Sequence, residues 1–217
     1  VALGEYVIFD LETTSADADE ALIVEIAGVL VQGGREVDAF HRLISGVALP
    51  KAVAALTGIT AAELQERGVP LGEALHDFLT WLAERPLLAH NGQRFDVPVL
   101  RRSLESVGLN LGQRVLLDSL LLAPLAFCLE DEAPEVYALE SLHARITGQG
   151  HASAHRALED CRATLTVVGA CLERLRDFPE ATRAFLQTMP VPEFRLLWSR
   201  APLTQEEVTA RVNALLR

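Results

Sequence analysis

The chain is organised around the stretch EYVIFDLE at residues 5–12, an apolar, β-branched run that ends in acids. This pattern predicts a buried strand whose tip emerges at a site. Because residues i and i+2 of a strand share a face, Asp10 and Glu12 should project together while Leu11 enters the core. Two adjacent carboxylates repel each other unless they are protonated or bind a cation, and Mg²⁺ prefers such oxygen ligands. Alone, however, the pair is a weak signal, and a solvated strand end explains it better.

The residues after this strand indicate a mixed sheet with helices. Two further strands are predicted at 22–31 and 36–44, joined by a hairpin turn at Gly33 and Gly34. Three antiparallel strands followed by helices imply a mixed sheet, and a short fourth strand is predicted at 87–90. Helices are predicted at 50–56, 61–67, 71–84, 97–107, 119–128 and 138–146.

The last third of the chain contains its clearest helix and a segment of different character. Residues 147–154 (TGQGHASA) are small and polar, so we expect a loop there. A single apolar stripe at helical period follows, formed by Leu158, Cys161, Leu165, Val168, Leu172 and Leu175. The segment 178–217 contains four of the ten prolines and a short helix with a capping box, Thr204 with Glu207. We therefore predict a domain at 1–177 and a C-terminal appendage or tether at 178–217.

A second motif, HNGQRFD at residues 90–96, follows the fourth predicted strand and opens a helix. Asp96 should therefore lie near the start of that helix. An acid that is stabilised there by the helix dipole is the alternative interpretation. The motif is moderately informative, because Asn91, an aromatic residue and Asp96 cluster just beyond a strand end.

A third motif pairs His155 with Asp160 at the start of the long helix. Asp160 borders the apolar stripe, and an acid beside a buried face needs a metal or an arginine as its partner. On one ideal helix the two residues would lie about 140° apart, so they converge only if His155 lies in the preceding loop or a frayed first turn. A loop histidine near a metal site suits a general base. A surface histidine is the alternative.

Together the motifs resemble the DEDDh exonucleases, the superfamily that includes bacterial proofreading subunits and oligoribonucleases. The resemblance runs through FDLETT (9–14), AHNGQRFD (89–96) and HRALEDCRAT (155–164), in family order, and covers about residues 5–176. LTGIT (56–60) and LDSL (117–120) are also similar to family segments. The resemblance implies an α/β, ribonuclease H-like fold, with a mixed five-stranded sheet flanked by helices.

The resemblance also implies site residues and a reaction. Four acids become the metal ligands, His155 becomes the general base, and four further residues match positions near the terminal nucleotide. The acids are Asp10, Glu12, Asp96 and Asp160, and the nucleotide-proximal residues are Thr13, Thr14, Thr57 and Asn91. Two Mg²⁺ or Mn²⁺ ions are expected to flank the scissile phosphate. The implied activity is a 3′-to-5′ exonuclease that releases nucleoside 5′-monophosphates, in DNA repair or proofreading.

Three departures from the family pattern bear on substrate preference. Ser15 stands where a glycine is frequent, Thr57 stands where many members have histidine, and the segment between Asn91 and Phe95 is longer than usual. Single-stranded DNA is the favoured substrate, and an RNase acting on RNA 3′ ends stays open. A catalytically silent interaction module and a structural tethering domain are further alternatives, although the intact set of five residues argues against a silent module.

Composition limits the partners. The net charge of −11 argues against bulk electrostatic coating of nucleic acid, and basic residues near the motifs are few, namely Arg94, Arg101, Arg102, Arg156 and Arg162. A polymerase, helicase or other repair protein is expected to bind through the C-terminal segment. The three scattered cysteines indicate a reducing compartment, and a cytoplasmic location is expected. No membrane span or signal peptide is expected, and the absence of an initiating Met fits a processed or excised piece of a longer chain.

Overall fold

The computed structural model describes residues 5–127, 134, 136–150 and 154–175 of the chain. These residues contain a five-stranded sheet in the order β3-β2-β1-β4-β5. Strand β1 pairs antiparallel with β2 and parallel with β4, β2 pairs antiparallel with β3, and β4 pairs parallel with β5. The strands are β1 (Glu5–Thr13), β2 (Ile23–Gln32), β3 (Arg35–Leu43), β4 (Leu87–Ala89) and β5 (Leu116–Asp118). The mixed five-stranded α/β fold that the family resemblance implied is confirmed.

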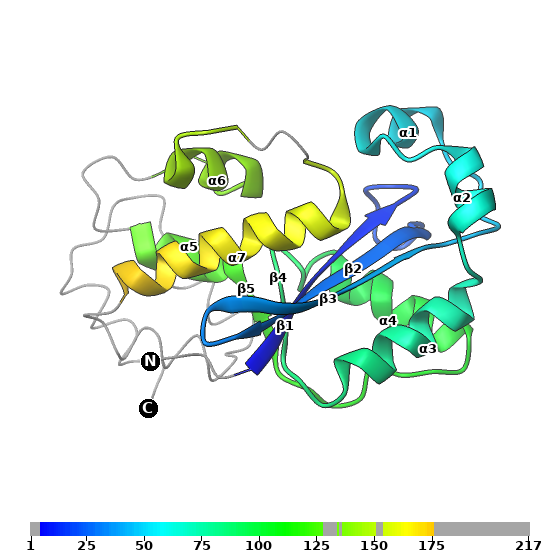
Figure 1. Cartoon of the computed structure of the whole chain (residues 1–217), viewed down its shortest axis with the longest axis horizontal. Helices are drawn as coiled ribbons and strands as arrows, with labels where there is room; N and C mark the ends of the chain where they lie inside the picture. Colours follow the sequence, from blue (N-terminus) through cyan, green and yellow to red (C-terminus); the bar gives the residue numbers. More distant parts are fainter. Residues whose placement is uncertain (1–4, 128–133, 135, 151–153, 176–217) are drawn as a thin grey trace.

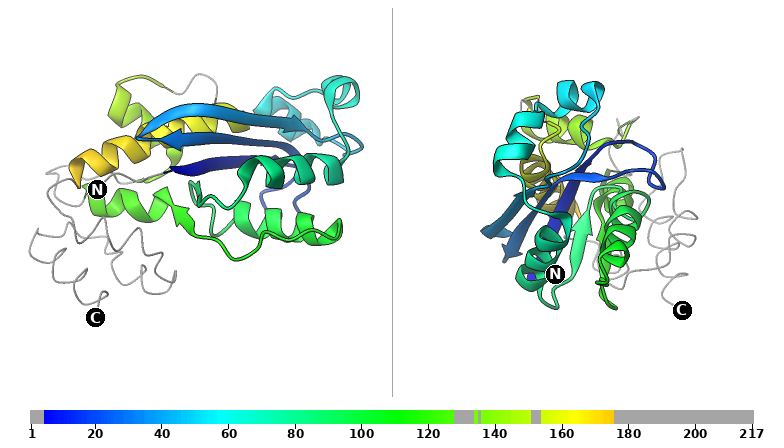
Figure 2. Two further views of the ribbon diagram at one scale, coloured as in Figure 1. Left: turned by 60° about the horizontal axis from the view of Figure 1, so that its bottom comes forward. Right: turned by 90° about the vertical axis from the view of Figure 1, so that its right-hand side faces the viewer.

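Helices cover both faces of this sheet (Figure 1, Figure 2). One face carries α5 (Ser119–Phe127), α6 (Leu139–Thr147) and α7 (Ala157–Arg174). The other face carries α3 (Leu71–Leu82) and α4 (Asp96–Ser106). Two short helices, α1 (Lys51–Thr57) and α2 (Ala61–Arg67), connect β3 to α3. Since the expected ranges differ from these bounds by only one or two residues, the predicted helices are confirmed.

The alternation of β1 decides where the acids point. Tyr6 and Ile8 enter the core beneath α5, α6 and α7, whereas Val7, Phe9 and Leu11 enter the core beneath α3 and α4. Side chains two residues apart share a face of a strand. Asp10 and Glu12 therefore continue the row of Tyr6 and Ile8 on the α7 face, and Leu11 is buried as its position predicted.

The apolar stripe of α7 differs slightly from its prediction. The buried face is centred on the smaller side chains Cys161, Thr164, Val168 and Cys171, while Leu158, Leu165 and Leu172 flank it and are partly buried. Small side chains let the helix approach the sheet closely, and Cys161 Sγ lies 3.8 Å from the carbonyl oxygen of Ala27 in β2. Cys161 and Cys171 are buried free thiols, in agreement with their prediction as small core residues.

A glycine lets a tryptophan pack directly on β2. A Cβ atom added to Gly28 would lie 2.7 Å from Cζ3 of Trp81 in α3, which is too close for a real contact. The Trp81 ring packs near Phe40 and Phe78, and its Nε1–H donates to Asp38 Oδ2 at 2.8 Å. These residues belong to the α3 face of the sheet, opposite to the face that Asp10 occupies.

Several predictions concern parts of the chain that the structure does not describe. The C-terminal appendage at 178–217, Cys128 and His151 lie outside the described residues. No helix among the described ranges combines the length and the apolar character that a bilayer span requires.

Candidate active site

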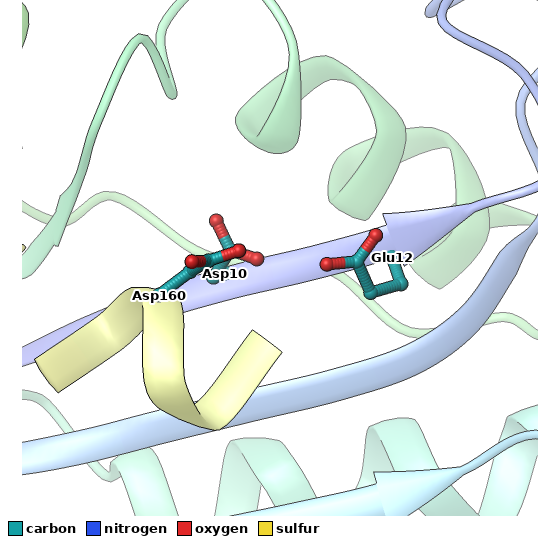
Figure 3. Close-up of side chains that lie close together, drawn as sticks. All are labelled: Asp10, Glu12 and Asp160. Carbon is teal, nitrogen blue, oxygen red and sulfur yellow. The ribbon is translucent and has the colours of Figure 1, made fainter. Parts of the chain in front are cut away.

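Three of the four predicted acids meet at the junction of β1 and α7. Asp10 and Glu12 come from adjacent positions on one face of β1, and Asp160 comes from the first turn of α7 (Figure 3). One carboxylate oxygen from each residue lies within 4.8 Å of the others. Asp96 is not part of this closest group, but it is buried at the start of α4 and lines the same cleft.

The acids line a cleft of about 680 Å³ that also contains the predicted base. His155 and Asn91 lie in its wall, together with the apolar and aromatic side chains of Leu120, Phe95 and Tyr137. The structure thus brings into one cleft five side chains that are spread over about two thirds of the sequence. Their assignment as catalytic residues stays a prediction.

In the absence of a cation, burial and mutual repulsion disfavour the ionised form of these acids and so raise their pKa values. Burial, followed by the charges of Asp96, Asp160, Glu12 and Glu25, raises the pKa of Asp10 well above its ordinary value. Burial and then Asp160 raise the pKa of Glu12 to about 8. Burial is also the main reason that the pKa of Asp96 rises to about 7, and nearby backbone N–H groups oppose it. A bound cation would relieve this repulsion, and the oxygen-only donor set fits a hard divalent ion such as Mg²⁺ or Mn²⁺.

His155 lies ahead of the helix that carries Asp160, a position from which both residues reach the same cleft. The residue lies just before α7, with a left-handed backbone φ of 66°. Its backbone N–H donates to Asp160 Oδ2 at 3.0 Å. This bond connects the loop to the acidic side of the cleft, and it uses the backbone of His155, not its imidazole.

Glu25, a buried acid on β2 directly opposite Glu12, was not among the residues predicted from the sequence. Burial alone would raise its pKa, but hydrogen bonds from His41, from the backbone of Ala157 and from Arg156 lower the pKa below its ordinary value. The distances are 2.6 Å from His41 Nε2, 3.0 Å from Ala157 N and 3.1 Å from Arg156 Nη2. Glu25 therefore ties β2 to the start of α7, three residues before Asp160. Its signal in the sequence was a single acid inside the apolar run IVEIAGVLV.

Asp118 lies in the LDSL segment that resembles the family but was assigned no role from the sequence, and it fixes the backbone of the second motif. Its buried carboxylate accepts hydrogen bonds from the backbone N–H groups of Asn91 at 2.8 Å, Gln93 at 3.1 Å and Leu120 at 2.9 Å. Burial raises its pKa to about 6 although these bonds oppose the shift. Asn91 has a left-handed φ of 62°, so this loop is held in a conformation that needs such support.

The three threonines that were predicted to lie near the terminal nucleotide form hydrogen bonds within the protein through their hydroxyl groups. Thr13 Oγ1 donates to the carbonyl oxygen of Ser15, and Thr14 Oγ1 accepts from Leu22 N. Thr57 is buried and donates to the carbonyl oxygen of the residue one turn before it in α1. They are not among the described residues that line the cleft, whereas Asn91 is. Their contacts with a terminal nucleotide stay predictions.

Solved structures share this fold. A structure of exonuclease I superimposes with a TM-score of 0.71 and 16% sequence identity, and the match covers 88% of this chain and 47% of that chain. E. coli exonuclease I in complex with a dA16 oligonucleotide matches with a TM-score of 0.68 and 18% identity, over 88% of this chain and 46% of that chain. At these identities the likeness establishes the fold.

Similarity in sequence identifies the family of the chain. DNA polymerase III PolC-type of Thermotoga maritima is 34% identical over 173 residues, which are 79% of this chain and 12% of the relative. The PolC-type polymerase of Clostridium perfringens is 31% identical over 176 residues, 80% of this chain and 12% of the relative. The chain thus spans about an eighth of the length of these relatives. A family model described as exonuclease (RNase T) matches residues 7–168. With this match over most of its length and a ribonuclease H-like fold, the chain belongs to the exonuclease family.

Proposed function

We propose that this chain is a metal-dependent 3′-to-5′ exonuclease that releases nucleoside 5′-monophosphates from single-stranded DNA. The observation that carries the proposal is the convergence of Asp10, Glu12 and Asp160 within 4.8 Å, in a cleft that also holds Asp96 and His155. Four carboxylates would repel a phosphodiester, so the site is suited to such a substrate only with cations present. The same arrangement therefore argues for a metal and for a phosphate substrate.

Each residue has a role that follows from its place. Asp10, Glu12, Asp96 and Asp160 would hold two Mg²⁺ or Mn²⁺ ions, which would supply positive charge to the phosphate and to the departing 3′ oxygen. His155 would accept the proton of the attacking water. Glu25 keeps the start of α7 in place, and Asp118 keeps the loop that leads into Asp96 in place. The water oxygen forms the new bond to phosphorus while the bond to the 3′ oxygen breaks.

The choice of DNA rests on the relatives. Exonuclease I has been solved with dA16 and dT13 oligonucleotides, and the curated relatives are DNA polymerases of the PolC type. We therefore propose single-stranded DNA as the substrate and repair or proofreading as the role. A polymerase or another repair protein is the proposed partner, through residues 178–217.

A gel assay tests polarity and sugar preference together. The chain is incubated with Mg²⁺ and with 5′-labelled single-stranded DNA or RNA of one sequence. We expect a ladder that shortens from the 3′ end of the DNA, and a 3′-terminal phosphate should slow it. A labelled mononucleotide as first product would contradict the polarity, and faster degradation of RNA would favour the RNase alternative. Stabilisation by Mg²⁺ without any cleavage would indicate a silent module.

The proposed domain boundary makes a separate prediction. All described elements and all five site residues lie before residue 176. A chain that ends at Asp177 should fold, retain kcat/KM within about twofold and melt within about 4 °C of the full chain, the shift that roughly 1 kcal/mol produces at this size. Circular dichroism melts and the gel assay measure both. Aggregation or much earlier melting of the shortened chain would show that residues 178–217 belong to the domain.

A further inference from the structure

Three of the five arginines near the motifs are engaged in contacts that hold the fold. The guanidinium of Arg102 donates to two carbonyl oxygens of the loop between β1 and β2. Arg156 is bonded to the buried Glu25. Arg162 makes two hydrogen bonds to Glu36 of β3, at 3.0 and 2.9 Å, and one to its neighbour on α7. The guanidinium groups of all three are therefore already hydrogen-bonded within the protein, and those of Arg156 and Arg162 are also paired with carboxylates.

Arg94 differs from these three. It is exposed, it lines the cleft, and its side chain makes no hydrogen bond or ion pair within the part of the chain that the structure describes. Arg101 on α4 is likewise exposed and free of such contacts among the described residues, but it is not part of the cleft wall. Within the described part of the chain, the cleft therefore has one arginine whose charge is available to a ligand.

The backbone beneath Arg94 is fixed even though its side chain is free. Arg94 N donates to the carbonyl oxygen of Asn91 at 3.1 Å, and the carboxylate of Asp118 holds both Asn91 and Gln93. Asp96 follows two residues later at the start of α4. The guanidinium is thus carried on a rigid loop, beside the acids but outside their group.

The other groups in the cleft do not offer a permanent positive charge. His90 is bonded to Ser119 Oγ and to the carbonyl oxygen of Tyr137, both at 2.9 Å, and burial lowers its pKa to about 4. The remaining described lining residues are acids, apolar or aromatic side chains, Asn91 and His155. Metals at the acids would compensate the charge of the scissile phosphate. Among the described residues that line the cleft, Arg94 is the one that could offer a permanent positive charge to a neighbouring phosphate of the strand.

We propose that Arg94 binds the phosphodiester next to the scissile one, on its 5′ side, and so sets a preference for substrates of at least three nucleotides. A guanidinium suits this role because it can donate two parallel hydrogen bonds to phosphate oxygens. The proposal rests on the proposed exonuclease function and adds one substrate contact to it. Only one phosphate beyond the scissile group is expected to be bound in this way.

The test compares thymidine oligomers with one and two phosphodiesters, TpT and TpTpT, using the full chain with Mg²⁺. In the wild type, kcat/KM should be higher for TpTpT, because only that substrate carries the second phosphate. Arg94→Ala should raise KM for TpTpT about tenfold, a size typical of charge-assisted hydrogen bonds, and should affect TpT less than about threefold. For a longer single strand, Arg94→Ala should also make the plot of log binding constant against log salt concentration shallower by about 0.7.

Two control variants sharpen this test. Arg101→Ala removes an exposed arginine outside the cleft and should leave both substrates unaffected. Arg94→Lys keeps the charge without the planar fork and should recover part of the loss. Equal losses for TpT and TpTpT, no loss for either, or a similar loss in Arg101→Ala would each overturn the proposal.

A binding measurement keeps the outcome separate from activity. Fluorescence anisotropy of a 5′-fluorescein thymidine dodecamer is recorded with Mg²⁺. The two proteins compared are the His155→Ala variant, in which hydrolysis is slowed, and the same variant with Arg94→Ala added. Adding Arg94→Ala should weaken binding about tenfold. If the wild type hydrolyses nothing but Arg94→Ala still weakens binding, the exonuclease proposal fails and the phosphate contact stands. Unchanged binding would refute the contact whatever the activity.

Discussion

Replacing Asp10 with asparagine is expected to lower kcat by at least about 10³-fold, because one of the proposed metal ligands is lost. Metal ions supply several kcal/mol of transition-state stabilisation in such reactions, and each 1.4 kcal/mol corresponds to about tenfold in rate. Asp160→Asn should have a comparable effect. Steady-state release of mononucleotide from single-stranded DNA measures it. Glu159→Gln is the matched control, because Glu159 adjoins Asp160 on α7 but pairs with Arg162 instead of lining the cleft.

Chelation should have the same effect as these substitutions. Excess EDTA is expected to silence the wild type, and added Mg²⁺ or Mn²⁺ should restore it. Undiminished cleavage in EDTA would refute the metal proposal. The control variant Glu159→Gln should respond to both treatments like the wild type.

Although Asp10→Asn should lower activity, it should raise the stability of the metal-free protein. An acid whose pKa is raised in the folded state binds its proton more tightly when the protein is folded. Its contribution to folding stability is therefore fully present below about pH 4 and is lost as the pH rises through the folded-state pKa. The pKa values of about 8 for Glu12 and about 7 for Asp96 place this loss between about pH 4 and 8. In EDTA at pH 8, Asp10→Asn should raise Tm by about 2–4 °C. A lower Tm at that pH would contradict the repulsion.

The second large effect is expected at His155. Loss of a general base typically costs about 10²–10⁴-fold in rate, so His155→Ala should lower kcat by about that factor while the four acids still bind metal. Because His155 has a φ of 66°, an alanine there is also strained. His155→Asn separates the two effects, since asparagine tolerates the left-handed region better. Similar losses in both variants would assign the effect to the imidazole.

His151 supplies the comparison for this experiment. It lies four residues earlier, outside the described residues, in the segment that was predicted as a loop. His151→Ala should cost less than about tenfold, through ordering of the loop alone. Metal affinity, measured by the Mg²⁺ dependence of kcat, should change little in either variant. A loss at His151 that equals or exceeds the loss at His155 would overturn the assignment.

The long elements were predictable from the sequence, whereas the fifth strand was not. The strands β1, β2 and β3 each extend over nine or ten residues, which is long enough for a β-branched apolar run to be distinct. Strands β4 and β5 have three residues each, and three residues do not establish a period. The short run at 87–90 was nevertheless predicted as a strand, whereas Leu116–Asp118 was not. Its presence follows from pairing with β4, which is a property of the assembled sheet. The fifth strand was therefore implied only by the family resemblance.

The candidate site was partly predictable for a similar reason. The alternation of β1 and the helical angle of α7 are local rules, and they correctly placed Asp10 beside Glu12 and His155 ahead of its helix. The partners of Glu25 lie 16 and more than 130 residues away, so no local pattern indicates them. The same holds for Asp118, whose carboxylate binds backbone groups that precede it by more than 20 residues. Buried acids of this kind become interpretable only when the partners are known.

The contact between Trp81 and Gly28 gives this protein an internal optical probe. Of the two tryptophans in the chain, Trp198 is removed when the chain ends at Asp177, so Trp81 becomes the sole indole emitter. Its ring centroid lies 5.5 Å from that of Phe40 and 6.2 Å from that of Phe78, on the sheet face opposite to Asp10. Its emission should therefore follow loosening of the β2, β3 and α3 layer, while the sheet separates it from direct quenching by Mn²⁺. Titrating Mn²⁺ during denaturation would then show whether ions that bind on one face of the sheet stiffen the other.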